Sequence, residues 1–200
     1  MAKQSWKPGN MIFPLPAVLV TCGDSQHSNM LTVAWTGTLC TNPPMCYIAV
    51  RPERHSYGII KANMEFTINL TTAQMAHATD WAGVRSGSEY DKWEETGLTS
   101  EPGVTVECPS IKESPVNIEC RVKEILPLGS HHLFIADVVN VLADESLLDA
   151  DTGAFDLGRA GLMSYTHGHY YRQGEEIGRF GFSVKKDSSR KKTTKKKSEN

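Results

Sequence analysis

The chain is divided into short apolar segments of strand length, each bounded by turn residues or prolines, and this pattern limits the possible folds more than any other feature. β-branched and aromatic residues dominate these segments, which is typical of β-strands. The strand candidates are residues 17–22, 29–35, 45–50, 65–70, 117–126 and 132–143. The pattern predicts a mainly β protein, with the first two segments paired as a hairpin across the turn-like Gly23-Asp24-Ser25.

Only short helices fit between these strands. Ser56 is a candidate N-cap for a helix of about two turns ending at Asn63, and Thr72 is a candidate cap for residues 73–81. Residues 82–115 are rich in turn formers and predict loop, with one helical turn near residues 89–94. We therefore expect a closed or nearly closed antiparallel barrel with a few short peripheral helices.

Charge separates the chain into two parts. Residues 185–200 hold eight Lys/Arg against two Asp/Glu, a net charge of +6, whereas residues 1–184 carry −8. Because this tail lacks apolar side chains, we expect it to be disordered and the single folded domain to span residues 1–184. A basic arm alone would bind nucleic acid only weakly, and no nucleic-acid motif accompanies it, so specific nucleic-acid binding is not expected.

The sequence does not favour a membrane protein, a secreted protein, a disulfide-rich protein or a metal-binding protein. No apolar run approaches the length of a membrane span, and Pro14 and Pro16 interrupt any signal-peptide core. The five cysteines are scattered without a C-x-x-C pair, which predicts free thiols in a reducing, cytoplasmic compartment. Adjacent His131 and His132 on a strand face opposite sides, and no third ligand lies near the His167/His169 pair, so no metal site is expected.

Two segments carry the chemistry. After the second strand, Trp35 precedes a predicted Thr36-Gly37-Thr38 turn, where an apolar platform and accessible backbone N–H groups suit a flat heteroaromatic ring. The alternative is a buried core tryptophan followed by an ordinary loop.

The second segment follows residues 45–50. Arg51 lies at the strand end, just before the predicted helix start at Ser56, and together they form a credible phosphate cradle. The alternative is that Arg51 and Arg54 are surface charges paired with Glu53 or Glu65.

Ordered blocks of sequence then resemble the flavin reductase-like, FMN-binding split-barrel family, which includes flavoredoxin. The blocks are PLPAVLVT, NMLTVAWTGT, NPP, RPERHSYGII, EFTINL, RSGS, DKW and HGHYYRQGEEIGRFG, and the resemblance covers roughly residues 11–184. The family pattern has an arginine where this chain has Ser88, and Arg85 is the candidate to replace it.

The resemblance implies a six-stranded split barrel that forms a homodimer, with FMN near the interface. The implied cofactor-binding residues are Asn29, Ala34, Trp35, Thr36, Gly37, Thr38, Arg51, His55, Ser56, Tyr57, Asn69, Ser86, Gly87 and Lys92. Asn29 and Ala34–Thr38 would line the flavin ring, and Asn69 would approach it. The phosphate end would be held by Arg51, His55, Ser56 and Tyr57. The site would be covered from one loop by Ser86, Gly87 and Lys92. Lys92 would serve either the phosphate or the reduced ring.

The resemblance implies an oxidoreductase that passes hydride or electrons from NAD(P)H or a protein donor through FMN. No catalytic side chain is expected, because the flavin performs the electron transfer. One alternative is a non-enzymatic FMN carrier reduced only by a partner protein. Another is an interaction protein that holds an oligonucleotide on the barrel and uses the basic tail as an anchor.

Overall fold

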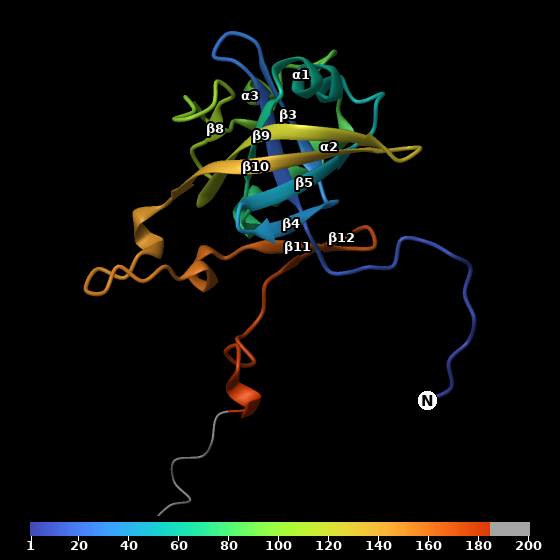
Figure 1. Ribbon diagram of the computed structural model, residues 1–200, viewed down its shortest axis with the longest axis vertical. Helices are drawn as coiled ribbons and strands as arrows, with labels where there is room; N and C mark the ends of the chain where they lie inside the picture. The colour runs from blue at the N-terminus through green and yellow to red at the C-terminus, as the bar shows by residue number, and fades with distance from the viewer. Residues whose placement is uncertain (185–200) are drawn as a thin grey trace, which may run out of the picture.

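The computed structural model describes residues 1–184, and its centre is a seven-stranded antiparallel sheet with the order β3-β2-β6-β9-β10-β5-β4 (Figure 1). The strands are β2 (Val18–Gly23), β3 (Ser28–Val33), β4 (Thr36–Thr41), β5 (Pro44–Val50), β6 (Glu65–Asn69), β9 (Val116–Pro127) and β10 (His132–Ala143). Each of the six predicted segments forms a strand, and β2 and β3 form the predicted hairpin.

The sheet closes because its two edge strands are consecutive in the chain. β3 and β4 are separated only by Ala34 and Trp35, and the Ala49 N–H donates to the Trp35 carbonyl at 2.9 Å. Counted as one bent strand, β3 and β4 make this a six-stranded barrel, as predicted. The predicted turn at Thr36–Thr38 was wrong, because these residues begin β4 and pair with Cys46–Ile48 of β5.

The barrel interior holds alternate side chains of its strands, as the two-residue period of a strand requires. In β5, Cys46, Ile48 and Val50 point inward, where they meet the fully buried rings of Phe66 and Phe134. All five cysteines are free, as predicted, and all except Cys40 are buried.

Short helices lie against the barrel. They are α1 (His55–Asn63), the 3₁₀ turn η1 (Ala73–Met75), α2 (Ala76–Val84) and α3 (Lys92–Thr96). The predicted cap at Ser56 was wrong: Arg54 is the N-cap residue, without a side-chain hydrogen bond, and Ser56 is buried in the first turn. The predicted helical turn after residue 89 corresponds to α3, where the Asp91 side chain accepts the Trp93 and Glu94 N–H groups.

A second, three-stranded sheet packs beside the barrel. It consists of β1 (Leu15–Pro16), β11 (Met163–Thr166) and β12 (His169–Arg172), in the order β1-β11-β12. The remaining short elements are β7 (Ser100–Glu101), β8 (Ser110–Ile111), η2 (Glu145–Leu147), η3 (Leu157–Ala160) and η4 (Phe182–Val184).

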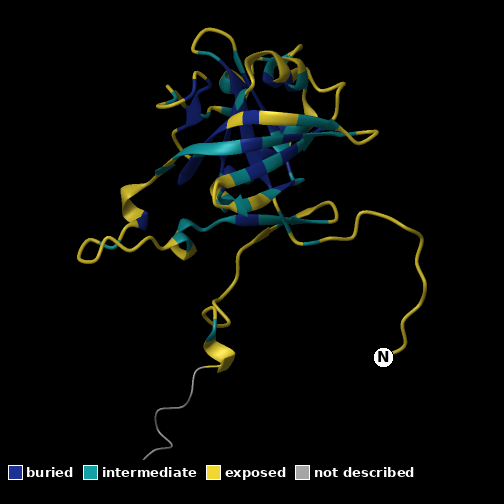
Figure 2. Ribbon diagram, viewed as in Figure 1, coloured by how far each residue is buried: buried dark blue, intermediate teal, exposed yellow. Residues whose placement is uncertain are grey.

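Both terminal segments extend away from the barrel (Figures 1 and 2). Residues 1–12 and 173–180 are exposed throughout. We call these segments, together with residues 181–184, the terminal arms. The predicted disordered tail, residues 185–200, lies outside the described residues. Over residues 1–184, none of the helices has the length and hydropathy to span a membrane.

Candidate functional site

A groove runs along the outer edge of β3. It consists of two adjoining cavities of about 350 and 330 Å³, which share Leu31, Thr32, Arg51, Arg54 and Gly83. Because β3 is the last strand on its side of the sheet, β2 is its only partner strand within residues 1–184, and its other edge offers backbone donors and acceptors. We call this feature the β3 groove.

The opposite wall of the groove is α2, which is fixed against β3. The Thr32 hydroxyl donates to the Thr79 carbonyl of α2. A Cβ at Gly83 would lie 3.0 Å from Thr32 Cβ, which is tighter than ordinary packing allows, so the glycine permits this close approach. The distance between β3 and α2, and with it the width of the groove, is therefore determined by Gly83, Thr32 and the hydrogen bond between Thr32 and Thr79.

One end of the groove is aromatic. The Trp35 ring lies 4.2 Å from the His131 ring, and Tyr165 and Tyr170 line the same cavity from β11 and β12. Desolvation, followed by the charge of Arg51, lowers the pKa of His131. This end therefore presents flat, uncharged rings at neutral pH.

A hydrogen bond crosses the mouth of this aromatic end. The Tyr170 hydroxyl donates to Asp80 Oδ1 on α2 at 3.1 Å. Burial, together with this contact, raises the pKa of Tyr170 to about 12, so the phenol stays protonated. The contact ties the β11–β12 hairpin to the helix across the groove.

The other end of the groove is cationic. Arg51, Arg54, Arg85 and Lys92 line it, and the one carboxylate among its lining residues is Glu53, 3.4 Å from Arg51 in an exposed ion pair. The N-terminus of α1 opens onto the same cavity through His55 and Ser56, without a side-chain cap. Helix N–H groups and arginines together favour an anion such as phosphate.

Lys92 is the buried member of this cationic group, with 4% of its surface exposed. Its ammonium donates to the Met30 carbonyl at 2.9 Å and to the Ala82 carbonyl at 2.6 Å. Desolvation, followed by the charge of Arg54, lowers its pKa to about 8. An ammonium has three donors, and these two hydrogen bonds are the ones that Lys92 Nζ makes within residues 1–184.

The floor of the cationic end is held by Asn29 and Ser56. The Asn29 amide donates to the Ser56 hydroxyl at 2.7 Å, which joins β3 to α1. A Cβ at Gly87 would lie 2.3 Å from Asn29 Oδ1, so any larger residue there would displace the Asn29 amide. The 86–92 loop can therefore approach the strand closely.

The structure brings together nine of the fourteen residues that the sequence indicated. The residues that line the groove are Asn29, Ala34, Trp35, Arg51, His55, Ser56, Ser86, Gly87 and Lys92. Arg51 pairs with Glu53, as the alternative interpretation predicted, and it also lines both cavities of the groove.

The other five residues do not line these two cavities. In β4, Thr36 donates to the Tyr47 carbonyl at 2.6 Å, Gly37 packs on the Tyr47 ring, and Thr38 is exposed. The Tyr57 hydroxyl lies 2.8 Å from His132 Nδ1.

Asn69 is completely buried in the barrel wall. Its amide group donates to the Leu19 carbonyl at 2.9 Å and accepts the Ile111 N–H at 2.9 Å, so its visible role is to join three segments of the fold.

Sequence reasoning missed part of the groove. Asp80, Gly83, His131 and Tyr165 line it but belong to no block that indicated a ligand. Tyr170 lies in the HGHYYRQG block, and Arg85 occupies the groove as the candidate replacement for the arginine missing at Ser88. His131 and His132 do face different partners, Trp35 and Tyr57. Over residues 1–184, no group of three His, Cys, Asp or Glu side chains could hold a metal ion.

A family model and solved structures of known proteins both match this chain over most of its length. Residues 10–174 match the family model described as "Flavin reductase like domain". The fold is similar to flavoredoxin of Desulfovibrio vulgaris (Miyazaki F), with 30% identity, a TM-score of 0.83, and coverage of 92% of this chain and 99% of that one. It is also similar to an FMN-binding protein from Thermus thermophilus, solved with bound 1-cyclohex-2-enone, with 25% identity, a TM-score of 0.74, and coverage of 90% and 98%.

A relative with a named activity is the reductase component of a 4-nitrophenol 4-monooxygenase/4-nitrocatechol 2-monooxygenase from Rhodococcus opacus. It is 26% identical over 134 residues, which cover 66% of this chain and 67% of the relative.

Proposed function

The chain belongs to the flavin reductase-like family, and we propose that it is an oxidoreductase that binds FMN in the β3 groove. The observation that carries this proposal is the division of the groove into an aromatic end and a cationic end. FMN has the same division, with a flat ring system at one end and a phosphate at the other.

The residues of the groove fit this cofactor. Trp35 and Tyr165 would pack against the isoalloxazine ring, and the free edge of β3 would offer backbone groups to its polar edge. Arg51, Arg54 and Lys92 would hold the phosphate, with help from the N–H groups at the start of α1.

Bound FMN would supply the electron transfer, and the protein would supply binding, orientation and the local field. The neutral rings of the aromatic end would exclude water from one face of the ring system. The Tyr170–Asp80 contact would keep the β11–β12 hairpin across the groove. No side chain of the groove needs to act as a nucleophile or general acid.

We propose NAD(P)H as the electron donor, since the Rhodococcus opacus relative is named as a reductase component. The likeness to flavoredoxin favours a second candidate, an electron carrier that only a partner protein reduces. Anaerobic mixing of the FMN-loaded protein with NADH or NADPH separates the two. Bleaching of the flavin absorbance within seconds supports the reductase, whereas a flavin that stays oxidised with both nucleotides supports the carrier.

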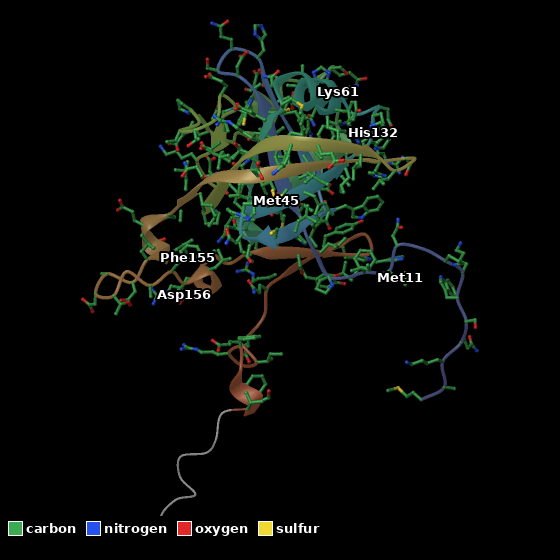
Figure 3. The ribbon with its side chains drawn as sticks, in the orientation of Figure 1. Met11, Met45, Lys61, His132, Phe155 and Asp156 are labelled. Atoms are coloured by element: carbon green, nitrogen blue, oxygen red, sulfur yellow. The ribbon has the colours of Figure 1, made fainter. Side chains whose placement is uncertain are left out.

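We also propose that the chain acts as a homodimer. Within residues 1–184, the terminal arms expose large apolar side chains (Figure 3 labels Met11 on the N-terminal arm). These side chains are Trp6, Met11, Ile12, Ile177, Phe180, Phe182 and Val184. A second copy would cover them, and a symmetric dimer is the commonest assembly of identical chains.

A further inference from the structure

One side chain at the aromatic end of the β3 groove is an acid. Among the described residues that line this cavity, Asp80 is the only carboxylate, and the cations beside it, Arg51 and Arg54, also line the cationic end. Within residues 1–184, Asp80 forms no ion pair. The aromatic end therefore holds a carboxylate whose charge no direct partner in that part of the chain neutralises.

The backbone of Asp80 is fixed relative to the groove. Asp80, Gly83 and Val84 all line the cavity, and their i, i+3 and i+4 spacing places them on one face of α2. The preceding residue, Thr79, accepts the Thr32 hydroxyl through its carbonyl and so joins α2 to β3. This face of the helix cannot move away from the strand without breaking that hydrogen bond.

The carboxylate of Asp80 is also held at its tip. The Tyr170 hydroxyl donates to Asp80 Oδ1 at 3.1 Å. Tyr170 in turn pairs with Tyr165 across the β11–β12 hairpin, and the centroids of the two rings lie 5.6 Å apart. Asp80 is therefore held from the helix side and from the hairpin side, which gives its negative charge a defined position at the aromatic end.

A negative charge in this position distinguishes the two redox states of a flavin. Reduction by two electrons with uptake of one proton leaves the ring system with one more negative charge than before. Repulsion by a nearby carboxylate weakens binding of the reduced form more than of the oxidised form, and this lowers the reduction potential. Asp80 is exposed, so water and salt screen part of the repulsion and the effect is moderate.

We propose that Asp80 lowers the reduction potential of the flavin in the β3 groove by placing one negative charge at the aromatic end. This inference rests on the proposed function, because the ring system must occupy the aromatic end to sense the charge. It gives a role in the redox chemistry to a residue outside the sequence blocks that indicated a ligand.

The test is the reduction potential of the FMN-loaded full chain, measured by anaerobic reduction with dithionite beside a reference dye. Asp80→Asn removes the charge but keeps an oxygen that can accept the Tyr170 hydroxyl. It should favour the reduced form by about 3- to 10-fold, which raises the potential by roughly 15–30 mV, since tenfold corresponds to about 30 mV for two electrons. Asp151→Asn removes an exposed carboxylate that does not line the groove and should keep the wild-type potential.

A second variant separates the charge from the hydrogen bond. Tyr170→Phe removes the donor and keeps the carboxylate, so its potential should lie at or below that of wild type. The difference between Asp80→Asn and wild type should also shrink at high salt, because salt screens an exposed charge. If Asp80→Asn does not fold, Asp80→Ala, which suits a helix better, has the same expected result.

The inference is overturned if the folded Asp80 variant has the wild-type potential, or if Tyr170→Phe raises the potential as much as the Asp80 variant does. The second result would show that the hydrogen bond and not the charge matters. If the wild-type chain binds no FMN, the proposed function fails together with this inference. If it binds FMN and the potentials do not differ, this inference alone fails.

Discussion

At the scale of single residues, the groove cations differ in burial and therefore in what each would contribute. Arg51 is exposed, reaches both cavities and shares its charge with Glu53. Lys92 is buried, and within residues 1–184 its ammonium donates only to backbone carbonyls. The arginine should act mainly through hydrogen bonds, and the lysine mainly through a charge that depends on pH.

Arg51→Ala should weaken FMN binding by roughly 1.5–3 kcal/mol, the usual contribution of a hydrogen bond to a charged group. This corresponds to about 10- to 150-fold in Kd. Fluorescence titration measures the change. Arg159→Ala removes a similarly exposed arginine, paired with Asp156 at 3.1 Å and not lining the groove, and should leave the Kd unchanged. Equal Kd values for Arg51→Ala and wild type would exclude the contact.

Lys92 should make FMN affinity depend on pH. Its burial lowers the pKa to about 8, so the charge that attracts phosphate is present below pH 8 and is lost as the pH rises above it. Binding of an anion favours the protonated form, so Kd should increase by up to about tenfold per pH unit above pH 8. Titrations between pH 7 and 9.5 measure this slope.

Lys92→Met should bind FMN more weakly at pH 7 and lose the slope between pH 8 and 9.5. The matched control is Lys61→Met, an exposed lysine on α1, which should keep the wild-type slope. A wild-type Kd that stays constant to pH 9.5 would show that the Lys92 charge does not contribute to binding.

The sequence predicted the position of some of these residues correctly and of others incorrectly. Arg51 and Lys92 could be found because they stand in recognisable blocks beside turn residues. Asn69 stands in an equally clear block, yet its amide is buried and bonded within the barrel wall. A strand pattern does not reveal which way a polar side chain faces when both faces of the strand are covered.

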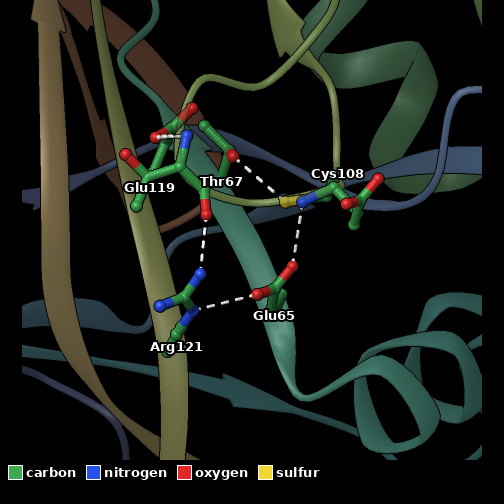
Figure 4. A network of polar contacts seen from close by, with 7 residues as sticks. Glu65, Thr67, Cys108, Glu119 and Arg121 are labelled. Carbon is green, nitrogen blue, oxygen red and sulfur yellow. Dashed lines mark hydrogen bonds and ion pairs between the residues drawn. The ribbon is translucent and has the colours of Figure 1, made fainter.

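At the scale of elements, one loop is attached to the barrel by a buried carboxylate. Glu119 of β9 is fully buried and accepts the Val104 N–H at 2.6 Å, the Thr105 N–H at 2.9 Å and the Asn140 amide at 3.0 Å. Beside it, Arg121 pairs with Glu65 at 3.0 Å and donates to the Thr105 carbonyl at 2.7 Å (Figure 4). The loop of residues 102–109 is therefore held by three charged side chains, Glu119, Arg121 and Glu65, whose carboxylate accepts the Glu107 N–H at 2.9 Å.

Glu119→Gln should lower the free energy of unfolding by about 1–3 kcal/mol, because the amide nitrogen cannot accept and leaves a buried donor without a partner. Urea denaturation measures the loss. Glu107→Gln, in the same loop but with an exposed side chain, should stay within about 0.5 kcal/mol of wild type. If both variants unfold at the wild-type urea concentration, Glu119 does not stabilise the loop.

Long strands could be predicted from sequence, whereas short elements could not. β9 and β10 each have twelve residues, and their apolar content exceeds what a loop would contain. The β11–β12 hairpin has strands of only four residues, too short to show a period, and gains stability from β1, far away in sequence. Two of the four rings at the aromatic end of the groove, Tyr165 and Tyr170, come from this hairpin. The strand pattern of the sequence therefore did not predict that part of the groove.

At the scale of the whole molecule, the terminal arms are notable because, within residues 1–184, they leave large aromatic side chains exposed. Their three most prominent aromatic residues are Trp6, Phe180 and Phe182. At roughly 150–250 Å² each, they would bury roughly 450–750 Å² per copy. A standard interface buries about 800 Å² per partner, so the arms alone would supply most of a stable interface.

The full chain should therefore sediment at twice its mass of 22.1 kDa at micromolar concentration. Replacing Ile177 and Phe180 with Asp should shift the species toward one copy, because charges on the arm oppose burial. Leu128→Asp changes an exposed leucine of the β9–β10 turn and should sediment as wild type. A wild-type chain that sediments at 22.1 kDa would contradict the homodimer.

The net charge of the molecule differs in sign from the local charge in the groove. The part of the chain that precedes the basic tail carries −8, yet three arginines and one lysine converge at one end of the groove. The net charge therefore could not predict the proposed anion site, because such a site depends on the local clustering of charges and not on their total.

The most direct test of the central claim is the visible absorption spectrum during titration of the purified chain with FMN. The account predicts a perturbed flavin spectrum with a one-to-one endpoint per chain and a Kd at or below the micromolar range, weakened in Arg51→Ala. A flavin spectrum that remains that of free FMN up to millimolar protein would contradict the account.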